Sequence, residues 1–126
     1  MIDFEGVTRL ESIGGGCVRA HWNHATSTQG VESYAVHIRA ENADVFQDEF
    51  LWTQLPYRED MTNAILRTEA DSNTYFRNDI TYYIGMKAIE STTQYISSTE
   101  NIKAVKVMGD GSMSIEAPDR KIAKIV

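Results

Sequence analysis

Apolar and polar residues alternate with a period of two in one segment of this chain after another, and helical periodicity is almost absent. Successive side chains of a β-strand point to opposite faces, so this pattern predicts short strands that each bury one face. The clearest case is 82–88, where Tyr82, Ile84 and Met86 alternate with more polar or smaller residues. The sequence therefore predicts an all-β fold.

Turn-forming residues divide the chain into seven expected strands. Gly14-Gly15-Gly16 suits a tight turn because glycine adopts positive φ without strain, and the polar run 25–30 is also typical of a turn. The expected strands are 7–12, 17–23, 34–39, one within 43–57, 62–69, 82–88 and 101–108. On the second strand, Val18, Ala20 and Trp22 share the face expected to point inward.

Two of these segments leave alternatives open. The segment 43–57 fits either a helical turn followed by a strand or a long irregular edge strand, and Pro56 ends it. In 62–69, either Ala64 and Leu66 or Ile65 points inward.

Charge and composition narrow the classes of partner. The 126 residues include 12 Lys and Arg against 18 Asp and Glu, a formal net charge of −6, and the arginines are scattered. Nucleic-acid binding, which needs clustered cations, is not expected.

No apolar run approaches the roughly 18–20 residues that span a bilayer, so membrane insertion is not expected. The start of the chain lacks the features of a signal peptide, and Cys17 is the only cysteine, which suits synthesis in a reducing cytoplasm.

Four aromatic residues carry a family resemblance that spans most of residues 4–108. They are Trp22 on the second strand, Tyr34 on the third, Phe76, and Tyr82 six residues later. With Ala88 closing the alternating run, the sequence resembles a fibronectin type III domain. The resemblance implies a seven-stranded, two-sheet antiparallel sandwich of immunoglobulin-like topology over residues 1–108, with the four aromatics in its core. It also implies that the Tyr82 hydroxyl bonds back to the backbone near Phe76. The sequence departs from the family by having Asn78-Asp79 where a proline is usual.

A narrower resemblance rests on Phe4-Glu5-Gly6-Val7, the run 82–88, and Glu100-Asn101. These are similar to fibronectin-type domains in structural proteins of tailed bacteriophage virions. The resemblance implies a non-enzymatic virion structural or decoration protein, made in the host cytoplasm, that binds capsid or tail proteins or its own copies and makes weak host-surface contact. The alternative is an adhesion or carbohydrate-binding accessory module in which Trp52, Tyr57 and Tyr83 stack on a ligand.

Residues 109–126 form the expected attachment arm. Gly109-Asp110-Gly111-Ser112 has the composition of a hinge, and the segment after it ends the chain on apolar residues. The residues expected to bind a partner are Met113, Ile115, Ile122, Ile125 and Val126. The alternative is that this segment folds back as an extra strand on its own sheet edge, covering it.

The aromatic segment Phe46–Tyr57 is a second candidate interface. Trp52 and Tyr57 are the expected partner-binding residues, and Phe50 is expected to be buried. The other reading is that these aromatics complete the core.

Metal and catalytic chemistry are not expected. Alternation places Cys17 and His21 outward on one strand, His24 in the next loop, and His37 on the outer face of the opposite sheet, so that the four do not converge. An enzymatic function would be favoured only if carboxylates such as Asp44, Asp48 and Glu49 shared a pocket and had raised pKa values. The sequence therefore predicts no enzyme activity, no metal and no cofactor.

Overall fold

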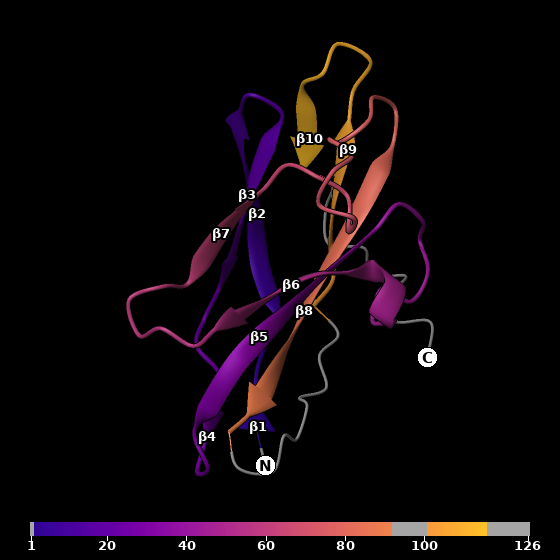
Figure 1. The fold of residues 1–126 in the computed structure, drawn as a ribbon. Coiled ribbons are helices and arrows are strands. Elements are labelled where there is room, and N and C mark those ends of the chain that lie inside the picture. Colours follow the sequence, from indigo (N-terminus) through magenta and orange to yellow (C-terminus); the bar gives the residue numbers. More distant parts are fainter. Residues whose placement is uncertain (1, 92–100, 116–126) are drawn as a thin grey trace.

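The protein is a sandwich of two antiparallel β-sheets in a computed structural model that describes residues 2–91 and 101–115 (Figure 1). This confirms the predicted all-β, two-sheet sandwich. The one helical element in these ranges is a single 3₁₀ turn, η1 (Asp48–Phe50). No helix in the described ranges is long and apolar enough to cross a bilayer.

One sheet has three strands in the order β2-β3-β7: β2 (Val7–Gly14), β3 (Cys17–Trp22) and β7 (Asn63–Leu66). Gly14 pairs with Cys17, so Gly15 and Gly16 form the two-residue turn between β2 and β3. Their φ angles of 64° and 73° suit a type I′ hairpin, which requires positive φ at both central positions.

The other sheet has five strands in the order β10-β9-β8-β5-β6. They are β10 (Met113–Ile115), β9 (Lys103–Val107), β8 (Thr81–Glu90), β5 (Val31–Arg39) and β6 (Leu51–Pro56). A two-stranded ribbon of β1 (Ile2–Asp3) and β4 (Thr26–Ser27) adds to the sandwich. The seven predicted strands correspond to β2, β3, β5, β6, β7, β8 and β9.

The structure decides the two open alternatives. In 43–57, η1 is directly followed by β6, which is the helical turn followed by a strand. On β7, Leu66 is fully buried and Ile65 is 40% exposed, so Ala64 and Leu66 face inward.

The core lies between the two sheets. Trp22 on β3 and Tyr34 on β5 are buried, and their ring centroids lie 5.6 Å apart. From β8, Tyr82, Ile84 and Met86 point into the same layer and are fully buried. The inward sets predicted for β3 and β8 are therefore confirmed.

The outer face of the five-stranded sheet is partly covered by the connection from β5 to β6. Val45 is fully buried there, and the Phe46 ring lies edge-on to His37 at 5.3 Å between centroids. His37 thus lies on the outer face of the sheet opposite β3, as predicted, but this connection covers it and leaves it only 7% exposed.

Candidate functional site

Tyr82 connects β8 to the chain that precedes it. Its hydroxyl accepts a hydrogen bond from the Arg77 backbone N–H at 2.9 Å and donates one to Glu69 Oε2 at 2.6 Å. Burial and the bond to Glu69 raise the pKa of Tyr82 above its usual value. The backbone bond next to Phe76 is the one that the family resemblance implies, and it gives Tyr82 a structural role.

Phe76 lies in the connection from β7 to β8 and packs on Tyr82, and we refer to these two residues as the Tyr82 corner. The Phe76 ring lies 4.6 Å from that of Tyr82 between centroids, and it packs against the core while remaining half-buried. Trp22, Tyr34 and Tyr82 are fully enclosed, so the four expected core aromatics differ in depth.

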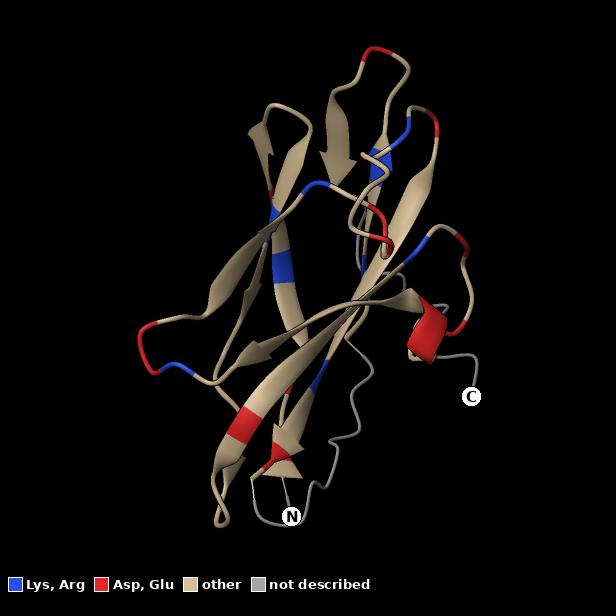
Figure 2. Cartoon of the chain, viewed as in Figure 1, with Lys and Arg blue, Asp and Glu red and all other residues tan. Residues whose placement is uncertain are grey.

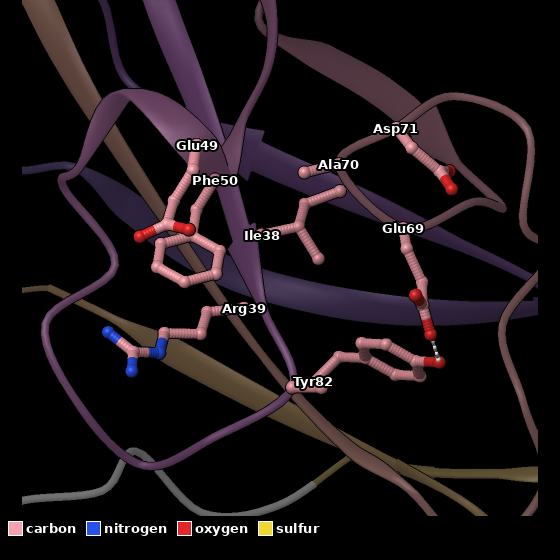
Figure 3. Close-up of a pocket in the computed structure, with 9 residues that line it drawn as sticks. Ile38, Arg39, Glu49, Phe50, Glu69, Ala70, Asp71 and Tyr82 are labelled. Atoms are coloured by element: carbon pink, nitrogen blue, oxygen red, sulfur yellow. Dashed lines mark hydrogen bonds between the residues drawn. The ribbon is translucent and has the colours of Figure 1, made fainter.

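A pocket of about 230 Å³ lies beside this corner (Figure 3). It is bounded by the end of β5, by η1 and by the connection from β7 to β8. Its lining residues are Ile38, Arg39, Ala40, Glu49, Phe50, Glu69, Ala70, Asp71 and Tyr82.

Three of the four charged residues that line this pocket, Arg39, Glu69 and Asp71, make contacts within the fold. Arg39 pairs with Glu41 at 2.8 Å and stacks over the Phe50 ring at 4.4 Å. Glu69 Oε2 accepts a second bond, from Arg77 Nε at 2.7 Å. Hydrogen bonds from the Thr74 hydroxyl and from the Thr74 and Asn73 backbone lower the pKa of Asp71. These contacts stabilise the connections around the pocket.

The carboxylates named as a condition for catalysis do not share this pocket. Glu49 lines it, whereas Asp44 and Asp48 are outside its lining. Asp44 Oδ1 instead accepts a hydrogen bond from the Phe46 backbone N–H at 2.9 Å.

The aromatic segment does not form one stacking surface. Trp52 on β6 is partly buried against the core, and Phe50 is half-buried under Arg39 rather than enclosed. Tyr57 is 37% exposed, with its ring 4.5 Å from that of His24 between centroids. Tyr83 lies on β8 between the inward-facing residues Tyr82 and Ile84, so it points to the outer face, away from the layer that Trp52 contacts.

The described part of the expected arm belongs to the sandwich itself. Met113 pairs with Val107 and Ile115 with Val105, so these residues form β10 on the same sheet as β9. Met113 packs against the core, and Ile115 is 39% exposed. For these residues, the structure shows the fold-back arrangement, in which the extra strand covers the edge of β9. Ile122, Ile125 and Val126 lie outside the described residues.

The histidines and the cysteine are dispersed. His21 Nε2 is 2.9 Å from Glu11 Oε1, and His24 bonds the Tyr34 hydroxyl at 2.8 Å and the Glu59 carbonyl at 3.0 Å. Within 2–91 and 101–115, no three His, Cys, Asp or Glu side chains gather as a metal site. Asp110 accepts bonds from the Ser112 backbone and hydroxyl, in the turn between β9 and β10.

Two residues that the sequence pattern did not single out lie on the surface beside the corner. Tyr75 is 69% exposed, the highest value among the large apolar and aromatic side chains described as exposed. Arg67, also exposed, lines a second pocket with it. In the sequence Arg67 is one of several scattered arginines, and Tyr75 lies in an irregular connection, so neither carries a periodic signal.

Charged residues are spread along the described chain. Figure 2 shows that Asp and Glu occur mainly on the connections and on η1, while Lys and Arg occur singly along strands and loops.

Comparison with known proteins finds similarity in fold only. No family model and no curated protein matches the chain. Among solved structures, it is similar to the spore cortex lytic enzyme SleM of Clostridium perfringens, with 18% sequence identity and a TM-score of 0.50. The match covers 77% of this chain and 26% of SleM. The chain thus spans about a quarter of that enzyme's length, and at this identity the similarity shows a shared fold alone.

Proposed function

We propose that the protein is a non-enzymatic structural or decoration module of a tailed bacteriophage virion, attached to capsid or tail components and to sister copies through its C-terminal sequence. The fibronectin-type resemblance of 4–7 and 82–88 supports this class. The sandwich fold supports it further, since such a domain offers a rigid body with exposed strand edges.

One observation carries the proposal: β10 is the last strand of the five-stranded sheet. It pairs with β9 along one edge, and no strand among the described residues pairs with the other. A strand at the edge of a sheet can add a strand from another chain, and Ile115 on β10 is an exposed apolar side chain that such a partner could bury. In the sequence, the six residues after Ile115 are followed by the apolar residues Ile122, Ile125 and Val126.

Repetition on a symmetric particle makes weak single contacts sufficient. Each copy adds its contact at a high effective concentration once its neighbours are attached, so the overall avidity exceeds the affinity of one site. A short apolar segment is enough for attachment under these conditions.

The test uses the full chain with Ile122→Asp and Ile125→Asp combined, studied by sedimentation over a range of concentrations. The wild type is expected to self-associate as its concentration rises, and the double variant is expected to remain a monomer. Ile65→Asp is the matched control, since it places the same charge at an exposed isoleucine on β7. A wild type that stays monomeric, or a double variant that associates like the wild type, contradicts the proposal.

The alternative function, adhesion to a carbohydrate, is favoured by a different observation. Trp52, Tyr57 and Tyr83 do not form one stacking surface, since Trp52 packs on the core. Tyr75, however, is exposed and lines a pocket, so its ring is accessible to a sugar.

A further inference from the structure

A pocket of about 300 Å³ lies between the β2–β3 turn and the connection from β7 to β8. Its lining residues are Gly15, Gly16, Arg67, Tyr75 and Phe76. This volume is at the small end of the range for ligand pockets and suits a single ring-sized group.

Arg67 gives this pocket a positive charge in an otherwise acidic chain. Within the described residues, it is the arginine whose guanidinium has neither a carboxylate nor a hydrogen-bond partner. Those that have a carboxylate within ion-pair distance are Arg9, Arg19, Arg39, Arg58 and Arg77. The pocket lining contains no carboxylate, so a bound anion would meet a cation that no internal partner neutralises.

Backbone pairing holds the aromatic and the cation together. The Phe76 N–H donates to the Arg67 carbonyl at 3.0 Å, and Thr68 forms a bridge with Tyr75. The Glu69 N–H donates to the Thr74 carbonyl at 2.7 Å. The two arms of the connection are therefore fixed against each other, which lowers the entropy lost when a ligand binds.

The β2–β3 turn forms the opposite wall with bare backbone. A Cβ added at Gly15 or Gly16 would meet no atom within 4 Å, so nothing crowds the turn. A ring lying on Tyr75 can thus approach the peptide groups of the turn.

We propose that this pocket binds a carboxylated sugar ring, such as a uronic acid unit of an acidic polysaccharide. A planar guanidinium pairs with a carboxylate through two parallel hydrogen bonds, which a neutral sugar cannot offer. The apolar C–H face of the ring stacks on Tyr75, as sugar rings do on exposed aromatic side chains. The proposal deepens the alternative carbohydrate-binding function and does not depend on attachment through the C-terminal sequence.

The test measures binding of methyl glucuronide and methyl glucoside to the full chain by calorimetry or by NMR titration. These probes differ only in the carboxylate. The glucuronide is expected to bind with a Kd of about 1–10 mM, and the glucoside about tenfold more weakly. Arg67→Gln is expected to remove that difference, and Tyr75→Ala to weaken both probes.

Matched controls separate the pocket from the general surface. Arg58→Gln removes an exposed arginine that pairs with Asp60, and this variant is expected to bind like the wild type. The double variant with Ile122→Asp and Ile125→Asp is also expected to bind the glucuronide like the wild type. A failure of attachment can therefore be distinguished from a failure of sugar binding.

Three results overturn the proposal. They are no glucuronide binding at concentrations tenfold above the expected Kd, equal affinity for the two probes, and unchanged affinity in a folded Arg67→Gln variant. Loss of self-association in Arg67→Gln without any sugar binding would assign the surface to a protein partner instead.

Discussion

A Cβ atom at Gly85 would lie 2.7 Å from Cζ of Phe46 and 2.9 Å from Cγ2 of Val45. Gly85 therefore leaves room on the outer face of β8 for the connection between β5 and β6. That connection covers His37 and places η1 beside the pocket of Figure 3. Because glycine has no side chain, the connection can pack closely on this face of the sheet at Gly85.

Gly85→Ala is expected to destabilise the protein by about 1–3 kcal/mol, because a methyl group forced into a packed site shifts its neighbours. Val45 is fully buried and has little room to move. Urea unfolding followed by tryptophan fluorescence measures the change. Gly109→Ala is the control, since its added Cβ would lie 3.6 Å from the nearest atom, an ordinary contact. Equal stability of the two variants would show that the connection adapts freely.

Tyr82→Phe is expected to cost about 1–2 kcal/mol, because Glu69 and the Arg77 N–H both lose a hydrogen-bond partner. Tyr75→Phe removes the same atom from a tyrosine that is 69% exposed, and its effect should stay within about 0.5 kcal/mol. Chemical unfolding of both variants gives the comparison. A cost in Tyr82→Phe no larger than in Tyr75→Phe would remove the structural role of the corner.

Stability is expected to fall in alkaline solution. Burial raises the pKa of Tyr34, and burial with the bond to Glu69 raises that of Tyr82. The unfolded chain therefore releases these protons first, and stability is lost as pH rises from about 10 through the folded-state pKa values. Unfolding measured across this range, with tyrosinate absorbance as the titration signal, should show a smaller loss for Tyr82→Phe than for the wild type. An equal loss would mean that Tyr82 titrates normally.

Most of the sandwich could be predicted because its strands bury one face and expose the other. Val18, Ala20 and Trp22 on β3 illustrate this, since alternation alone fixes which residues point inward. The same rule could not fix the direction of β7, where Ala64, Ile65 and Leu66 are all apolar. Packing against the opposite sheet settles it by enclosing Leu66.

The surface could not be predicted because it depends on connections without periodicity. Alternation places His37 on the outer face of its strand, where Val45 and Phe46, eight and nine residues further along the chain, cover it. The pocket at Arg67 likewise needs the β2–β3 turn, which lies some fifty residues earlier in the chain. Such long-range contacts leave no local pattern in one sequence.

His37 is expected to make stability depend on pH below neutrality. Burial, with Lys87 nearby, lowers its pKa, although backbone groups of Gln47 and Val45 oppose this. The unfolded chain therefore binds a proton first, and stability falls as pH drops from about 6.5 toward the lower folded-state pKa. His37→Leu should flatten the dependence in this window. A variant as sensitive to pH as the wild type would place the titrating group elsewhere.

Chains ending at Ile115 and at Ser112 should differ in stability, because β10 lies between these two ends. Both lack Ile122, Ile125 and Val126, so any difference reports on Met113–Ile115 alone. The shorter chain exposes the edge of β9 and removes Met113 from the core, and we expect it to melt several degrees lower and to aggregate more readily. The chain ending at Ile115 keeps the whole described sheet. Scanning calorimetry with light scattering decides the matter. Equal melting of the two truncated chains would show that β10 contributes nothing to the stability of the domain. The expected order would instead show that Met113–Ile115 are part of the sandwich.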